Sequence, residues 1–399
     1  MSGPFKRRAS LKSLPATSLP IDALRKQSLR RASVASGLKP APTASTAPRE
    51  LPWDLLDRCA LPVLFCHAAA VLASNALNVL NVSEVGTLAL FIWFTVVTVG
   101  AVLFYHNLKV TAAGKAVLIT GCDCSVGSAL ARHLDEQGFT VFAACQDAAS
   151  AEARDLKELC SGRVHVLQLD VASETQILAA SLYAVEHLPD GAAGLWAVVH
   201  AQAWVALGEI EWIPPQVIKK AVDVNFVGPT RVTQIMLPLV RRAKGRIVVV
   251  TSGLCRVASP ARGVHCGLLA ALETQADCLR KELRSRGVDV VVVAPGELTS
   301  GSSWLSDETI LAQAKDMWKQ LCQEQRTEYG EDYFEKALRS LEKYTQSQEC
   351  DLSPVLRALN DAIVRTFPLN KYTPVTRREK VQAIISDHLP RSVYDIIYA

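Results

Sequence analysis

Short apolar runs alternate with longer amphipathic stretches from about residue 115 onward. The apolar runs are residues 115–120, 139–145, 163–169, 195–200, 245–251 and 288–294. Their continuous, β-branched character is typical of strands that are buried on both faces. Helical stretches lie between them, at residues 126–137, 173–187, 228–241 and 265–286. This alternation predicts an α/β fold, a doubly wound parallel sheet of about seven strands with helices on both faces.

Two uncharged stretches precede this pattern. Residues 59–83 and residues 85–108 contain no Asp, Glu, Lys or Arg, and Glu84 alone separates them. The second stretch includes residues 86–105, an apolar segment of about twenty residues that is long enough to cross a bilayer core of about 30 Å. We therefore expect residues 86–105 to span a membrane.

The first stretch is less apolar because it contains His67, Asn75 and Asn78. Each polar group costs free energy in lipid, so this segment either spans the bilayer or lies at its interface. Basic residues lie both before and after the two stretches. Because cytosolic loops are enriched in Lys and Arg, this distribution favours an N-terminal transmembrane hairpin with both ends in the cytosol.

The first 50 residues hold ten Lys or Arg and two acidic residues, together with many Ser, Pro and Ala. No apolar period is long enough to order them, so we expect a disordered basic tail. The chain then divides into the tail (1–52), a membrane anchor (53–108) and an α/β domain (109–399). We expect an intracellular membrane, the endoplasmic reticulum with the domain facing the cytosol. An Arg-rich, acid-poor start also fits a mitochondrial transit peptide, which makes a mitochondrial membrane the alternative.

Overall composition excludes some classes of function. The formal net charge is only +4, which gives little support to nucleic-acid binding. The eleven cysteines are scattered, without CxxC pairs or zinc-like spacing with His. This distribution predicts reduced thiols rather than a disulfide framework, and it predicts no metal site.

The first apolar run of the α/β domain ends in a small-residue turn, TGCDCSVG at residues 120–127. A strand, such a turn and a helix start form an anion site, because backbone N–H groups and the helix dipole can receive a pyrophosphate. The candidate cofactor-binding residues of this turn are Gly121, Cys122, Asp123, Ser125, Val126 and Gly127.

With this turn, the chain resembles the short-chain dehydrogenase/reductases, which have a Rossmann-type fold. More narrowly, it resembles their membrane-bound retinol, 11-beta-hydroxysteroid and D-beta-hydroxybutyrate dehydrogenases, over roughly residues 114–399. Further matching motifs are LDV (169–171), GLW (194–196), VNF (224–226), GRIV (245–248), KYTP (371–374) and LP (389–390). The resemblance implies an NAD or NADP cofactor and a small hydrophobic alcohol or ketone as ligand.

The resemblance also assigns roles to individual residues. Asp170 would contact the adenine, and Asn225 would support a proton relay. Asp147, just past the second strand, is placed to meet a ribose hydroxyl, which favours NAD over NADP. Ser252 follows the fifth strand and occupies the position of the family's catalytic serine.

At the catalytic centre, the chain differs from the family that it resembles. His265, thirteen residues after Ser252, stands where the family has tyrosine, and Leu269 stands where it has lysine. Ala203 and Ser125 stand at glycine positions, where a side chain hinders the approach of the cofactor. We therefore expect a catalytically degenerate family member, and whether the cofactor still binds stays open. The alternative is an active oxidoreductase on a steroid, retinoid or other lipid alcohol that uses His265 as acid or base.

A long insert, residues 301–350, follows the sixth strand. Four apolar residues in it have helical spacing: Ile310, Ala314, Met317 and Leu321. This spacing predicts a helix that covers a ligand cleft, or alternatively a partner-binding surface. Homodimer formation is also left open.

Overall fold

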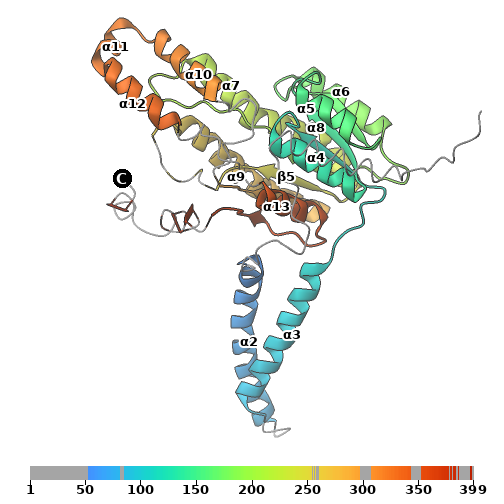
Figure 1. Cartoon of the computed structure of the whole chain (residues 1–399). Helices are drawn as coiled ribbons and strands as arrows, with labels where there is room; N and C mark the ends of the chain where they lie inside the picture. The colour runs from blue at the N-terminus through green and yellow to red at the C-terminus, as the bar shows by residue number, and fades with distance from the viewer. Residues whose placement is uncertain are drawn as a thin grey trace, which may run out of the picture. The chain divides into compact units, whose positions relative to one another are not determined.

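The computed structural model describes residues 53–80, 85–253, 255, 257, 260–296, 307–342, 352–376, 378–379, 381–382, 385 and 396–397. The expected basic tail and the LP motif at residues 389–390 lie outside the described residues. The described part contains a pair of long apolar helices and an α/β domain (Figure 1).

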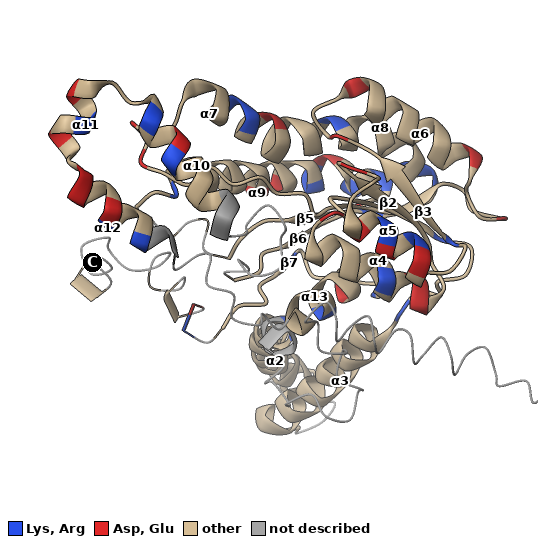
Figure 2. Ribbon diagram, turned by 45° about the horizontal axis from the view of Figure 1, so that its top comes forward, with Lys and Arg blue, Asp and Glu red and all other residues tan. Residues whose placement is uncertain are grey.

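The helix pair consists of α2 (Trp53–Val79) and α3 (Thr87–Asn107), which contact each other along their length. Both are long and apolar enough to cross a bilayer by length and composition. Cys66, Ala70 and Ser74 recur every four residues on α2, and all three are buried. Such a face of small residues lets two helices approach closely. Figure 2 shows α3 without any charged residue.

The α/β domain is built on one seven-stranded sheet in which every neighbouring pair of strands is parallel. The strand order is β3-β2-β1-β4-β5-β6-β7. The strands are β1 (Ala116–Thr120), β2 (Thr140–Cys145), β3 (Val164–Gln168), β4 (Leu195–His200), β5 (Arg246–Val250), β6 (Asp289–Val293) and β7 (Lys371–Tyr372). The predicted doubly wound parallel sheet is confirmed, and its order reverses between β1 and β4.

Helices cover both faces of the sheet because alternate strand residues point to opposite sides. Leu118 packs on the face covered by α6 (Glu174–Glu186), α8 (Gly228–Arg242) and α9 (Gly263–Leu283). Ile119 packs on the other face, under α4 (Ser125–Gln137), α5 (Ala151–Leu159) and α13 (Ser353–Val364). The remaining short elements are α7 (Pro215–Val222), the π-helix η1 (Asp223–Val227) and the 3-10 helix η2 (Arg284–Arg286).

The described part of the insert forms three helices, α10 (Asp307–Gln320), α11 (Gln323–Tyr329) and α12 (Glu331–Glu342). The apolar residues that predicted a helix lie on α10 or just after it, and all four are buried. Trp318 stacks on Phe334 with ring centroids 4.5 Å apart, and Trp212 packs edge-on against both. This aromatic cluster fixes the three helices to the loop that precedes α7.

A buried arginine caps the C-terminal end of α13. Arg246 is 2% exposed and its Nη1 donates to the carbonyl oxygens of Ala362 and Arg365, both at 2.8 Å. Its guanidinium also lies 4.5 Å from the centroid of the Trp196 ring. The segment after α13 then forms an antiparallel bridge, Lys109 with Arg365, to the segment after α3. The α/β domain is thus hydrogen-bonded to the chain that leaves the helix pair.

Candidate functional site

The carboxyl ends of β1, β4 and β5 carry the segments that the sequence singled out. In a parallel sheet these ends lie at one edge, beside the point where the strand order reverses, and ligands bind there. The site is therefore assembled from the loops after three adjacent central strands.

Two glycines shape the loop between β1 and α4. Gly121 has a φ of +75°, and a Cβ on it would lie 2.6 Å from the Cα of Gln202. A Cβ on Gly127 would lie 2.3 Å from the carbonyl oxygen of Gly121. Both positions therefore require glycine, the first also because of its left-handed backbone. Ser125 and Val126 begin α4, so the predicted arrangement of strand, turn and helix start is present.

The cysteine thiols of this loop are unreactive, and its aspartate carboxyl is held by a hydrogen bond. Burial raises the pKa of the Cys122 thiol and raises that of Cys124 to about 11, so both thiols stay protonated at neutral pH. Asp123 accepts a hydrogen bond from the backbone N–H of Gln146 at 3.1 Å, which connects the loop to the end of β2. Burial raises the pKa of this carboxyl. Asp147 turns back onto its own loop and accepts from the N–H of Ala149 at 2.8 Å.

A cavity of about 320 Å³ lies at the carboxyl ends of β2 and β3. Its lining includes Gln146 from the end of β2, Asp170 from the end of β3 and Val224 from η1. Lys219 and Asp223 also line it and form an ion pair of 2.6 Å. The structure thus places Asp170 in a cavity with both charged and apolar lining residues.

Asn225 holds the loop after β4. It is 2% exposed, its Oδ1 accepts from the N–H of Trp204 at 2.8 Å, and its Nδ2 donates to the carbonyl of Trp204 at 2.6 Å. Lys220 lies over the Trp204 ring, 4.9 Å from its centroid. Asn225 therefore fixes the backbone directly after Ala203.

The Gln202 side chain contacts Thr120 Oγ1, while its buried Nε2 has no hydrogen-bond partner among the described residues. An unpaired buried amide is costly, and a ligand atom in this loop would satisfy it. Sequence reasoning missed Gln202 and Trp204, because only the fold brings them against Gly121 and Asn225.

The Ser252 loop packs against α9. Cys255 donates its backbone N–H to the carbonyl of Ser252 at 3.2 Å, and its thiol donates to Glu273 Oε2 at 3.6 Å. Glu273 is one turn beyond Leu269 on α9, and Leu269 is one turn beyond His265. Since residues four apart share a helix face, the Ser252 loop lies against the face that carries all three residues.

His265 is a neutral imidazole at the start of α9. Burial, and then the nearby Arg262 guanidinium, lowers its pKa to about 4. Its Nδ1 is buried and has no hydrogen-bond partner among the described residues. Leu269 is 6% exposed and brings no polar group to the site. At neutral pH this face of α9 offers an imidazole that can donate one hydrogen bond and accept one.

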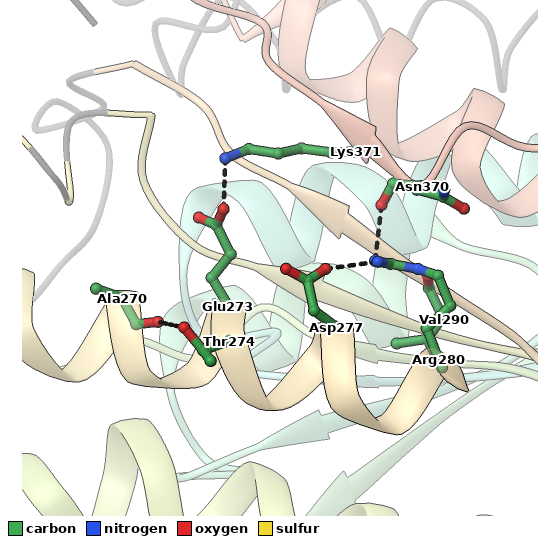
Figure 3. Close-up of polar contacts among 8 residues, drawn as sticks. All are labelled: Ala270, Glu273, Thr274, Asp277, Arg280, Val290, Asn370 and Lys371. Atoms are coloured by element: carbon green, nitrogen blue, oxygen red, sulfur yellow. Dashed lines mark hydrogen bonds and ion pairs between the residues drawn. The ribbon is translucent and has the colours of Figure 1, made fainter. Parts of the chain in front are cut away.

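Long-range contacts hold α9 in place (Figure 3). Lys371 Nζ lies 2.5 Å from Oε1 of Glu273, a carboxylate that is 4% exposed. Arg280 donates to the carbonyls of Val290 at 2.7 Å and Asn370 at 3.1 Å. These bonds join α9 to β6 and to the start of β7. They fix the helix register and therefore the positions of His265 and Leu269.

His200 ends β4 and contacts α8. Its Nε2 lies 2.8 Å from Thr233 Oγ1 on α8, and its buried Nδ1 has no partner among the described residues. Burial lowers its pKa to about 4. Within the described part of the chain, no three His, Cys, Asp or Glu side chains gather as metal ligands.

Comparisons with known proteins agree with this architecture. Residues 115–309 match the family model of short chain dehydrogenases. The chain is 37% identical to D-beta-hydroxybutyrate dehydrogenase of Rattus norvegicus, over 74% of this chain and 86% of that protein. It is 36% identical to retinol dehydrogenase 16 of Mus musculus, over 65% of this chain and 80% of that protein.

A crystal structure of a short-chain dehydrogenase from Streptomyces avermitilis superimposes with a TM-score of 0.55 at 18% identity, covering 71% of this chain and 96% of that one. At this identity the likeness concerns the fold alone. The fold, the glycine loop and the identity to long stretches of curated relatives lead to one conclusion. The chain belongs to the short-chain dehydrogenase/reductase family.

Proposed function

We propose that this protein is a membrane-anchored member of its family that binds NAD or NADP and a small ligand but has lost ordinary oxidoreductase turnover. The observation that carries this proposal is the face of α9 with His265, Leu269 and Glu273. In the family that the chain resembles, the position of His265 holds a tyrosine that passes a proton. The position of Leu269 holds a lysine that assists this tyrosine. Here they hold a neutral imidazole and a buried hydrocarbon.

The residues around the glycine loop fit the adenosine and pyrophosphate parts of a dinucleotide. Gly121 and Gly127 leave room for a close approach, and the first turn of α4 presents N–H groups and its dipole. The cavity beside Asp170 suits an adenine and its ribose. The unpaired Nε2 of Gln202 supplies a further donor. When bound, the nicotinamide of such a cofactor would supply hydride chemistry.

Fewer residues of the site suit the nicotinamide end of the cofactor. A lysine one turn after the acid–base residue would hold a ribose hydroxyl and lower the pKa of its neighbour by its charge. Leu269 can do neither. Burial lowers the pKa of the His265 imidazole and the positive charge of Arg262 lowers it further, so the imidazole stays neutral. Slow or absent turnover is therefore expected.

The alternative is an active oxidoreductase, and the neutral imidazole is the observation that favours it. A neutral His at a helix N-terminus can polarise a carbonyl and exchange a proton with a substrate oxygen. The relatives' names place hydroxybutyrate and retinol among the substrates of similar proteins. In this alternative the substrate is a small or lipid-like alcohol, and His265 takes the tyrosine's role.

The test uses the full chain in lipid nanodiscs. NADH and NADPH binding is measured by cofactor fluorescence, and turnover is measured with retinol, steroid and 3-hydroxybutyrate substrates. We expect binding without detectable turnover. The double variant His265→Tyr with Leu269→Lys restores the two missing groups, and we expect it to gain partial activity. Leu269→Met, a change of similar volume without a charge, is the control. Robust wild-type turnover that His265→Ala abolishes would establish the alternative.

We further propose an endoplasmic reticulum membrane, with the domain on the cytosolic side and a mitochondrial membrane as the alternative. The uncharged helices α2 and α3 and the surrounding basic residues support a hairpin. Carbonate extraction should leave the chain in the membrane pellet. Protease protection of the domain in sealed microsomes would contradict the proposed topology.

A further inference from the structure

The two edges of the sheet differ in charge. The segments that lead into the seven strands hold seven Lys or Arg and one acidic residue; they are residues 108–115, 138–139, 160–163, 187–194, 243–245, 284–288 and 365–370. The segments that follow β1 to β5 hold five acidic and two basic residues; they are residues 121–124, 146–150, 169–173, 201–214 and 251–262. Because the strands are parallel, the first set lies at the amino edge of the sheet and the second at the carboxyl edge. The amino edge is therefore basic, and the edge with the candidate site is acidic.

Two neighbouring turns of the amino edge carry exposed cations. The side chain of Lys244 lies against the turn after α9, since a Cβ on Gly287 would lie 3.8 Å from its Cγ and Cδ. The N–H of Asp289 donates to the carbonyl of Gly245 at 3.1 Å, which joins the two turns. The ion pairs of the described residues include none of the four exposed cations here. We call them the basic patch: Arg242, Lys244, Arg284 and Arg286.

The end of α3 is connected to this patch by direct contacts. Arg246 directly follows the turn after α8, and its Nη1 donates to the carbonyl of Arg365 at 2.8 Å. Arg365 forms the bridge with Lys109, two residues after the end of α3. In the last turn of α3, Tyr105 packs edge-on against Phe367 with ring centroids 5.4 Å apart. The basic patch therefore adjoins the segment by which the chain leaves the helix pair.

This position determines which partner suits the patch. Tyr is enriched at the headgroup level of membranes, which places Tyr105 and the nearby amino edge close to the lipid headgroups. An anionic membrane surface attracts basic residues next to a transmembrane helix, and each Lys or Arg near it raises the affinity roughly fivefold. The same surface repels the acidic carboxyl edge. Both effects favour one orientation of the domain.

We propose that the basic patch binds the anionic headgroups of the same bilayer that the hairpin crosses. The α/β domain then rests on the membrane by its amino edge, and the candidate site at the carboxyl edge opens away from the lipid. This inference rests on the proposed membrane anchor and adds a second, peripheral contact to it. Clustered Lys and Arg also suit nucleic acid, but the direct connection to α3 favours lipid.

The experiment measures the reactivity of single lysines in the full chain embedded in nanodiscs. A neutral acetylating ester modifies accessible lysines, and mass spectrometry gives the rate at each one. At about 0.15 M salt, Lys244 should react at least about threefold more slowly with about 30% phosphatidylserine than in pure phosphatidylcholine. Lys336, exposed on α12, is outside the patch and should react equally in both. At about 1 M salt the difference at Lys244 should vanish, because the Debye length falls to about 3 Å.

Two triple variants make the result specific, and each removes three positive charges. The first neutralises the arginines of the patch, Arg242→Gln, Arg284→Gln and Arg286→Gln. It should lower the ratio of docked to undocked domains roughly 100-fold, so that Lys244 reacts equally in both lipids. The control neutralises exposed cations of α10 and α12, Lys315→Gln, Lys319→Gln and Arg339→Gln, and should keep Lys244 protected. Thermal unfolding shows whether each variant folds, and the lipid and salt dependence of the wild type does not rely on either.

Equal Lys244 rates in the two lipids at about 0.15 M salt would overturn the proposal, as would protection retained in the arginine variant. Protection of Lys244 by a short DNA duplex, without protection by phosphatidylserine, would assign the patch to nucleic acid and would also overturn it. Release of the chain by carbonate would refute the proposed hairpin. A chain that resists carbonate but leaves Lys244 unprotected would refute the lipid contact alone.

Discussion

The buried His200 should make folding stability depend on pH. Its pKa is about 4 in the folded protein because burial disfavours the charged imidazole, whereas an unfolded chain has a His pKa of about 6.5. Below pH 6.5 the unfolded state therefore binds a proton that the folded state rejects until about pH 4. Stability is fully present above this window and is lost as the pH falls through it. From pH 7 to pH 5 the expected loss is about 2 kcal/mol for this one group.

The assay is urea unfolding of the nanodisc-embedded chain at several pH values between 7 and 5, followed by Trp fluorescence. His200→Asn should remove about 2 kcal/mol of the pH-dependent loss. Thr233→Val is the matched control, because it removes the hydroxyl beside Nε2 but leaves the imidazole. Its stability should be lower at every pH with the slope retained. If His200→Asn has the same slope as the wild type, the imidazole is not buried in its neutral form.

Three other substitutions test the architecture. Gly127→Ala should abolish NADH binding and lower the melting temperature, because its Cβ would lie 2.3 Å from a carbonyl oxygen; wild-type cofactor fluorescence would contradict the loop geometry. Arg246→Met should destabilise the domain by about 3 kcal/mol in urea unfolding, because two buried carbonyls lose a charged donor; a loss below about 1 kcal/mol would mean that the carbonyls find other donors. Ala70→Leu should separate α2 from α3, because Ala70 is buried. A disulfide between cysteines introduced at Ser74 and Val85, which are in hydrogen-bond contact, should then no longer form. An undiminished yield of this disulfide would place the helix contact elsewhere.

The six long strands could be predicted to within a residue or two at each end, because central strands of a parallel sheet are apolar on both faces. The seventh could not. β7 is two residues long and begins with the exposed Lys371, so it has no pattern of its own. It is defined by its pairing with β6 and by the bond from Lys371 to Glu273. Elements that depend on partners distant in sequence leave little local signal.

The same distinction applies to the candidate site. The 13- and 4-residue spacings that relate Ser252, His265 and Leu269 could be read along the chain, because only a loop and the first turns of one helix lie between them. The burial of Arg262, which is 9% exposed, could not be read in this way. Its burial depends on the left-handed turn at Ala261 and on the packing of neighbouring elements. A charged residue three positions before His265 is a weak signal that could have drawn attention to it.

The bridge between Lys109 and Arg365 has a consequence for biosynthesis. The two residues are 256 positions apart (365 − 109), and the hydrogen bonds beside them join Val110 to Val364 and Thr366 to Leu108. At a synthesis rate of 5–20 residues per second, roughly 13 to 50 s separate the translation of the two partners. During this time the segment after α3 has been made, while the segment after α13 that it will pair with does not yet exist. Attachment of the α/β domain to the helix pair is therefore among the last contacts that a newly made chain can complete.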